Sequence, residues 1–358
     1  DTLLYIPTLT HSKVYVFQAS ITPPNNSVIF SNVSNLTTLS PTGNSFSRTK
    51  HYLGSTNINY SYVNDIAIIS ENDIWAVGLF VLPDTNLAGY SDYNAAHWDG
   101  SKWEYKQIQF YYSCQTPTAT HPLPIYSIVA FDSENITMYS TMQSTSYSSQ
   151  GQGENVCTPI TAVTAWASHP NNLYIGGGLG KIYHYNGTVW TLIETGTNLY
   201  VNNIYGDYNK RTKSYEIVAV CAEYSLGFTS KIFKIEGEKA TEISMQGISD
   251  WVLRGWLYPG KKIFVVGDGL YVKNMKDSEW SKDNDPDLIT IYCIKGIRLN
   301  DIFAGASYDR LYHFNGIKWK KLFPENPNSY YSKIKIKNDI VVAAGSDGNQ
   351  GLITILKR

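Results

Sequence analysis

Residues 71–78 read ENDIWAVG, which is a polar turn followed by an apolar anchor, a hydrophobic pair and a glycine. The phrase returns as SENITMYS (133–140), PNNLYIGG (170–177), SYEIVAVC (214–221), GKKIFVVG (260–267), LNDIFAGA (299–306) and KNDIVVAA (337–344). Its anchors, from Ile74 to Ile340, recur at a mean spacing of about 44 residues, which is typical of a propeller blade. No stretch shows the 3.6-residue apolar period of a helix. The repeat therefore predicts an all-β fold, a seven-bladed β-propeller.

A second phrase predicts the hairpin that joins the two outer strands of a blade. It reads HWDGSKW (97–103), HYNGTVW (184–190) and HFNGIKW (313–319). Asp-Gly and Asn-Gly pairs favour the positive φ angles of a two-residue type I′ turn. His97, His184 and His313 share one repeat position in different blades, so they cannot converge on one ion. We therefore expect these histidines to be structural, and we expect no metal and no cofactor.

The last repeat unit is incomplete. After Ile340 the chain has room for two further strands but not for a fourth. An open blade would expose a row of unpaired backbone groups. We expect residues 45–53, SFSRTKHYL, to supply the missing strand and close the ring. Residues 1–43 then form an extended N-terminal arm or the remnant of a preceding β domain, and residues 44–358 form the propeller.

The repeats resemble those of a known group of proteins. NDIWAVG (72–78), HWDGSKW (97–103), HYNGTVW (184–190) and KNDIVVAAG (337–345) are similar to the repeats of uncharacterised secreted β-propeller proteins of the Bacteroidetes and Ignavibacteria type. The resemblance covers residues 44–358 and implies a propeller architecture. That family carries no established reaction, so the resemblance implies no catalytic residue.

The composition favours an extracellular or cell-surface protein, with the periplasm as the alternative. Charged residues make up 16% of the chain, below the ~25% of typical soluble domains, and there are 28 tyrosines. The net charge of −1 provides no electrostatic footprint for nucleic acid. No apolar run of the length that spans a membrane is found. The chain begins at Asp1, so we expect any signal peptide to have been removed.

The four cysteines fall into two pairs by their surroundings. Cys114 and Cys157 lie in polar, loop-like sequence, where a disulfide is expected in an oxidising compartment. Cys221 and Cys293 lie inside the apolar patterns IVAVCA and TIYCIKG, which predict buried thiols.

The spacing between repeats is longer than average in the first interval. Ile74 and Ile136 are 62 residues apart, and the surplus falls in residues 79–94 and 109–124, which should emerge on the same face of the propeller. Blade two adds the irregular segment 140–157, and residues 107–180 contain no Lys or Arg. We expect a polar collar here, with Tyr90, Tyr93, Tyr111, Tyr112 and Tyr147 as candidate contact residues. The alternative is a self-packed pair of loops stapled by Cys114 and Cys157.

These features predict a non-catalytic module that binds a protein or glycan partner, or a subunit of a surface assembly, through the collar. Self-assembly through the N-terminal arm is a further expectation, by donation of a strand to a neighbour. Two alternatives stay open. One is an enzyme that acts on a polysaccharide or glycoconjugate in the central funnel, which would need two facing carboxylates that the sequence does not identify. The other is a structural filament or coat subunit.

Overall fold

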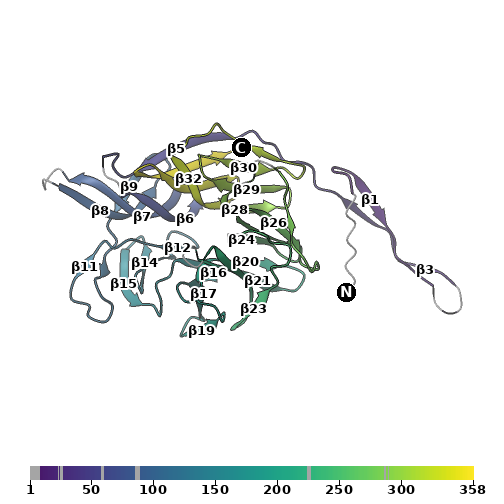
Figure 1. Ribbon diagram of the computed structural model, residues 1–358, viewed down its shortest axis with the longest axis horizontal. Helices are drawn as coiled ribbons and strands as arrows, with labels where there is room; N and C mark the ends of the chain where they lie inside the picture. Colours follow the sequence, from purple (N-terminus) through teal and green to yellow (C-terminus); the bar gives the residue numbers. More distant parts are fainter. Residues whose placement is uncertain are drawn as a thin grey trace.

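A computed structural model of the chain describes residues 9–22, 24, 27–57, 60–84, 89–223, 227–285, 288 and 290–358. Within these residues the secondary structure is entirely β, and seven four-stranded antiparallel sheets are arranged around a central axis (Figure 1). The chain is therefore a seven-bladed β-propeller, as the repeat predicts.

Each of the first six blades consists of four consecutive strands. Blade one contains β6 (Tyr62–Ser70), β7 (Asp73–Asp84), β8 (Gly89–Trp98) and β9 (Trp103–Lys106). Blade two contains β12 (Ser127–Ala130), β13 (Ile136–Ser140), β14 (Gln143–Ser148) and β15 (Gly151–Cys157). Blade three contains β16 (Thr164–His169), β17 (Asn172–Gly176), β18 (Lys181–Tyr185) and β19 (Trp190–Glu194).

Blade four contains β20 (Tyr200–Asn209), β21 (Ser214–Glu223), β22 (Thr229–Glu236) and β23 (Lys239–Ile243). Blade five contains β24 (Val252–Tyr258), β25 (Lys262–Gly267), β26 (Gly269–Asn274) and β27 (Ser281–Lys282). Blade six contains β28 (Ile291–Arg298), β29 (Asp301–Ala306), β30 (Leu311–Phe314) and β31 (Trp319–Lys321). Blade seven contains β32 (Ser329–Lys337), β33 (Ile340–Asp347), β34 (Gln350–Lys357) and β5 (Ser47–Leu53).

The repeat phrase marks the second strand of every blade, and its anchor is buried each time. The anchors are Ile74, Ile136, Leu173, Ile217, Ile263, Ile302 and Ile340, and all lie in the core. Six of them, all except Leu173, belong to apolar clusters that residues of adjacent blades form together. The recurrence at about 44 residues therefore reflects one repeated packing contact.

The outer hairpins differ from the two-residue turn that their Asp-Gly and Asn-Gly pairs predict. Trp98 pairs with Trp103, so the loop between them has four residues. Gly100 has a φ of 96°, but Asp99 is not among the residues with positive φ. Instead, the Asp99 carboxylate accepts hydrogen bonds from the backbone N–H groups of Ser101 and Lys102. Asn186 and Asn315 do the same in their hairpins, so a capping side chain and a single left-handed glycine, rather than two successive positive φ angles, shape these turns.

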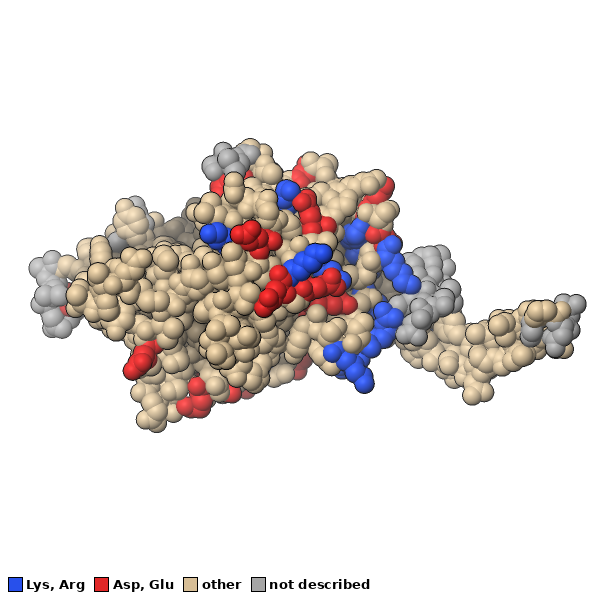
Figure 2. Space-filling model, turned by 90° about the horizontal axis from the view of Figure 1, so that it is seen from below, with Lys and Arg blue, Asp and Glu red and all other residues tan. Residues whose placement is uncertain are grey.

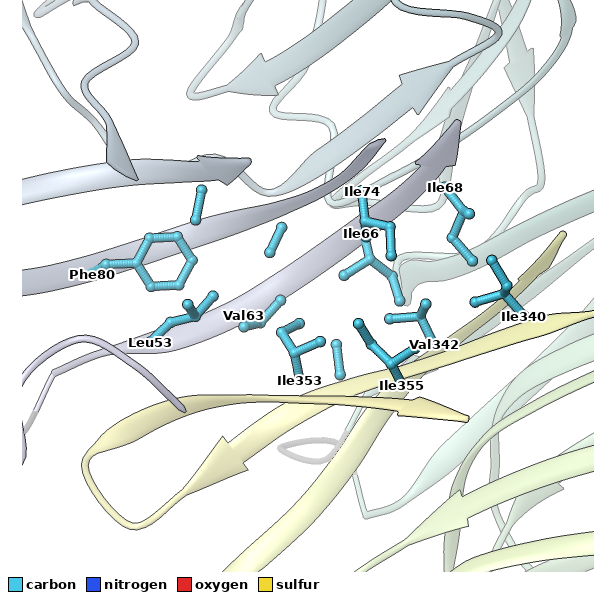
Figure 3. Packing of buried hydrophobic residues seen from close by; sticks show 13 residues of the cluster. Leu53, Val63, Ile66, Ile68, Ile74, Phe80, Ile340, Val342, Ile353 and Ile355 are labelled. Carbon is cyan, nitrogen blue, oxygen red and sulfur yellow. The ribbon is translucent and has the colours of Figure 1, made fainter. Parts of the chain in front are cut away.

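The ring is closed by the strand that precedes blade one. β5 pairs antiparallel with β34, from Leu53 opposite Gly351 to Ser47 opposite Lys357. Leu53 is buried against Val63 and Phe80 of blade one and Ile353 of blade seven. Figure 3 shows these side chains meeting between the two sheets. The predicted closure is confirmed, and it joins the two ends of the propeller within one blade.

The long first interval is confirmed as two insertions, but blade two is more regular than expected. One insertion lengthens the β7–β8 hairpin, and the other forms the small hairpin of β10 (Phe110–Tyr111) and β11 (Thr120–His121). Segment 140–157 forms the third and fourth strands β14 and β15, with one β-bulge between Thr145 and Tyr147. Its buried positions include the polar residues Gln143 and Thr145, so the segment lacks the apolar alternation from which a strand is predicted.

The described part of the N-terminal segment forms a narrow ribbon outside the seven blades. β1 (Val14–Phe17) pairs with β4 (Ser34–Thr37), and β2 (Ser20–Ile21) pairs with β3 (Ile29–Phe30). Figure 1 shows this ribbon projecting from the side of the propeller. Its base is held by blade six, where the Thr42 hydroxyl donates to the Asn300 carbonyl at 2.7 Å.

Candidate functional site

One face of the propeller carries the turns between the second and third strands of each blade and the links to the next blade, and we call it the turn face. The Phe228 ring, in the turn of blade four, lies 6.0 Å from the Trp251 ring at the start of blade five. The Tyr330 ring, at the start of blade seven, lies 6.2 Å from the Tyr292 ring at the start of blade six. These contacts join neighbouring blades on the turn face.

A disulfide fastens the blade-one insertion to blade two. Cys114, in the β10–β11 hairpin, is bonded to Cys157 at the end of β15, with a Cα–Cα distance of 5.8 Å. The predicted pairing is confirmed. Cys221 and Cys293 are free and buried, as predicted, and burial raises the pKa of each thiol to about 12.

Three amide side chains clamp the same insertion by copying the hydrogen bonds of a peptide group. Each donates to a backbone carbonyl and accepts from the N–H of the same residue. The clamps are Asn94 on Ile108, Gln152 on Gln109 and Gln143 on Tyr111. Buried amides with both functions satisfied rigidify a segment. Many polar side chains of the collar therefore hold the collar itself rigid.

Four of the five candidate tyrosines lie in the insertion or on the strand that leads from it. Tyr90 is 58% exposed and Tyr112 is 76% exposed, so both are accessible. Tyr93 is half-buried against Tyr105, at 5.6 Å between ring centroids. Tyr111 is half-buried and is held through its backbone.

Tyr147 is not brought to the same place. It pairs with Ile136 at the beginning of β13, which is the end of the blade away from the turn face. Its ring packs edge-on against Trp75 at 4.9 Å. Tyr147 therefore packs blade two against blade one, and the collar contains the other four tyrosines.

The turn face also carries a set of side chains that the sequence did not single out. In four blades the turn between second and third strands holds a large apolar residue with positive φ, namely Met142, Leu179, Phe228 and Tyr308, at 52°, 58°, 58° and 62°. Their side chains are 44%, 62%, 57% and 48% exposed. A left-handed backbone costs a bulky residue about 1–2 kcal/mol, and these apolar side chains leave about half of their surface exposed. Strained residues of this kind are concentrated at binding sites.

The first strands of the blades line the central channel and are linked to one another by polar groups. At equivalent positions the Thr164 hydroxyl oxygen accepts from the Ile204 N–H at 3.3 Å, and the side-chain amide oxygen of Asn203 accepts from the Gly255 N–H at 2.9 Å. The Arg254 guanidinium donates to the Tyr292 carbonyl at 2.9 Å. These bonds connect the inner strands of blades three to six and stiffen this part of the channel wall.

The channel encloses a cavity of about 420 Å³ into which basic side chains project. They are Arg254 in blade five, Lys295 in blade six, and Lys333 and Lys335 in blade seven. Within the described lining, Asp65 is the one carboxylate. Sequence reasoning missed this cluster because Arg254 and Lys295 are single cations inside apolar strand patterns, WVLRGW and TIYCIKG, and Lys333 and Lys335 alternate with apolar residues as on an ordinary strand with one polar face.

Asp65 is held ionised by its surroundings. Burial pushes its pKa upward, but Lys333, Lys335 and two backbone N–H groups outweigh this, and the pKa lies below its usual range. The carboxylate accepts from the Ser127 hydroxyl at 2.9 Å and from the Ile66 N–H at 3.0 Å. The Lys335 and Lys333 ammonium groups lie farther away, at 3.8 and 3.9 Å. A carboxylate in this state is a poor proton donor for glycoside hydrolysis.

The repeated histidines have a structural role in each blade, as predicted. Each lies on the third strand and bonds to a polar residue at the start of the second strand: His97 to Asp73, His184 to Asn172 and His313 to Asp301, at 2.9, 2.7 and 2.8 Å. Each ring also packs closely on an aromatic ring of the same sheet. The three histidines remain in separate blades.

Comparison with known proteins supports the fold. No family model matches the chain, and none of the curated proteins matches it. Among solved structures, YCF48 bound to D1 peptide superimposes with a TM-score of 0.63 at 14% identity, covering 87% of this chain and 97% of that one. The WD40 β-propeller domain of Doa1 gives 0.60 at 12% identity, covering 86% and 95%. The extracellular domain of BT4673 from B. thetaiotaomicron gives 0.58 at 15% identity, covering 85% and 39%. The resemblance seen in the sequence is thus confirmed for the propeller architecture.

The surface charge is uneven. On the face shown in Figure 2, Lys and Arg side chains lie on the side nearer the arm, and the far side shows none. This agrees with the absence of Lys and Arg from residues 107–180. A search of the described residues finds no helix that is long and apolar enough to cross a membrane.

Proposed function

We propose that this chain is a non-catalytic, extracellular binding module that holds a protein partner on its turn face. One observation carries the proposal: four blades expose a large apolar side chain from a strained, left-handed turn on the same face. The turn backbone does not require those side chains, since Asn or Gly would fit the turns with less strain. A partner that buries these side chains would explain why they occupy strained turns.

The chemistry of the surface favours a protein. Met, Leu, Phe and Tyr side chains around a channel mouth match the apolar, aromatic character of interface cores. Exposed tyrosines extend this surface outward: Tyr112 lies on the disulfide-fastened insertion, and Tyr90 lies in the lengthened β7–β8 hairpin. YCF48, which shares the fold, has been solved with a bound peptide. The disulfide and the structural similarity to an extracellular domain support an oxidising location.

Site-specific photo-crosslinking in the source organism tests this proposal. A photoreactive residue at position 179 or 308 should give one discrete adduct that mass spectrometry identifies as a single protein. Val189 and Ile317 are matched controls, because they are 53% and 55% exposed in hairpins on the opposite face. Equal adducts from both faces, or none from the turn face, would overturn the proposal. A Leu179→Asn substitution should suppress the adduct at position 308.

Assembly with further copies of the chain is a second candidate, favoured by the ribbon of the arm. Val14 and Val16 lie on one face of it and are 63% and 64% exposed. Ile21 and Phe30 farther along are 65% and 61% exposed. A ribbon of this kind suits strand addition to a neighbouring sheet. Light scattering should show oligomers that Val16→Asp dissociates, whereas Val189→Asp leaves them intact; a monomer in both cases contradicts self-assembly.

A further inference from the structure

The channel holds more positive charge than its own carboxylate can balance. Arg254, Lys295, Lys333 and Lys335 line one cavity of about 420 Å³ together with Asp65. Asp207, on the inner strand β20 of blade four, acts on Lys295 from outside this lining. Within the described lining, the cations therefore outnumber the carboxylates by four to one.

The positions of these cations follow from the register of the inner strands. Arg254 and Lys333 both come directly after a β-bulge, opposite Val266 and Ala344. In blade six the position that corresponds to Arg254 and Lys333 is Cys293. Lys295 lies two residues beyond Cys293, and Lys335 lies two residues beyond Lys333. Because residues i and i+2 of a strand share a face and are separated by about 7 Å, the cations form two layers at that spacing along the channel.

The positive charge of the second layer is poorly compensated. The Lys295 ammonium group lies 3.5 Å from the centre of the Tyr205 ring, which belongs to blade four, so its side chain crosses toward the axis. Burial and the neighbouring Lys335 charge hold the pKa of Lys295 well below its usual range. A cation–π contact offsets part of the cost of a desolvated ammonium group but does not neutralise it.

We propose that the channel is a binding site for a small polyanion with at least two phosphate or carboxylate groups. One anionic group would lie between Arg254 and Lys333, and the next, about 7 Å along the axis, between Lys295 and Lys335. The cavity volume falls in the range of small-molecule sites, which is about 300–1,000 Å³. Tyr205 supplies an apolar wall beside the second group. This site is separate from the apolar turn-face residues.

Isothermal titration with tripolyphosphate and with citrate tests the inference and distinguishes phosphate from carboxylate ligands. At least one should bind to the full chain above a potassium chloride control of equal ionic strength. Lys295→Gln and Lys333→Gln should each weaken binding about tenfold or more, and Lys320→Gln, an exposed lysine on the outer strand of blade six, should leave it unchanged. No binding by either probe, or equal loss in all three variants, would overturn the proposal.

Two further measurements keep the result interpretable. Leu179→Asn on the turn face should retain polyanion binding, so failure of the channel site and failure of the turn face are distinguishable. Thermal melting should confirm that each lysine variant is folded. A folded Lys295→Gln/Lys333→Gln double variant that binds citrate or tripolyphosphate as tightly as the native chain would also refute the channel site.

The pH dependence provides an independent check. Burial, opposed by Asp65 and reinforced by Arg254 and Lys335, lowers the pKa of Lys333 to about 8, and the Cys293 thiol also faces it. Lys333 is therefore charged below this pH and loses its charge above it. Citrate keeps its carboxylates ionised throughout this range, so its affinity should fall as the pH rises from 7 to 9.5. An affinity that is constant over this range would contradict a role for Lys333.

Discussion

Replacing Leu179 and Tyr308 with Asn should leave the propeller as stable as before or slightly more stable, although both residues are large and apolar. Leu179 is followed by Gly180, with φ angles of 58° and 62°, and Tyr308 is followed by Asp309, with 62° at both. Two successive positive φ angles are those of a type I′ turn, for which Asn is a preferred first residue. The substitution therefore supplies the residue that the backbone requires.

Two opposing contributions determine the change in the free energy of unfolding. Relief of the left-handed backbone contributes about 1–2 kcal/mol per residue, of which Asn recovers a part. Leu179 is 62% exposed, so about two fifths of its side chain is buried; at about 2 kcal/mol for a fully buried leucine, its removal costs about 0.8 kcal/mol. The net change for Leu179→Asn is about 0 to +1 kcal/mol. Tyr308 is 48% exposed and its ring also faces Arg310, so the change in the free energy of unfolding for Tyr308→Asn should be closer to zero.

Thermal melting and equilibrium denaturation of the single and double variants would measure this. The matched control is Leu53→Ala, a large-to-small change at a site that the fold does require. If Leu179→Asn lowered the free energy of unfolding by more than about 1.5 kcal/mol, the side chain would be part of the core and the reasoning would fail. Stability that is retained while crosslinking to the partner is lost would show that the side chain is kept for binding.

Three other outcomes are expected. Leu53→Ala should lower the free energy of unfolding by about 2–5 kcal/mol, because Leu53 is 1% exposed where blades seven and one meet; a loss below about 1 kcal/mol in denaturant titration would contradict the closure. Replacing Cys114 and Cys157 with Ser should lower it by about 4 kcal/mol, since the disulfide closes a loop across a separation of 43 residues; an unchanged melting temperature would mean that the amide clamps suffice. Lys295→Met should raise the free energy of unfolding, because burial and the neighbouring Lys335 charge hold the pKa of Lys295 well below its usual range; a lower melting temperature would contradict that interpretation.

The hairpins show how far local sequence determines local structure. Asp99-Gly100 and Asn186-Gly187 have the residues of a type I′ turn but form four-residue loops, because their side chains cap the following N–H groups. The turns at Leu179-Gly180 and Tyr308-Asp309 adopt two positive φ angles. Tyr308-Asp309 does so without the glycine that usually signals such a turn. The register of the flanking strands imposes these conformations, and local residue preference cannot predict them.

The candidate sites were accessible to sequence reasoning to different degrees. Cys114 and Cys157 stood out from their polar surroundings, and their pairing was predicted. The extra length of the first interval identified Tyr90 and Tyr112 as candidate contact residues, and both are exposed. Tyr147 was misplaced because a Ser- and Gln-rich strand looked like a loop.

By itself, the sequence determined the architecture. A phrase that recurs seven times produces one buried contact per blade, and periodicity along the chain is enough to reveal it. Tertiary structure alone decided the functional surfaces. The four channel cations come from three blades and span residues 254–335, and the strained turn residues come from four blades. Closure of the ring brings them together, because equivalent positions in each blade face the same axis, and a single strand carries no sign of which residues will meet there.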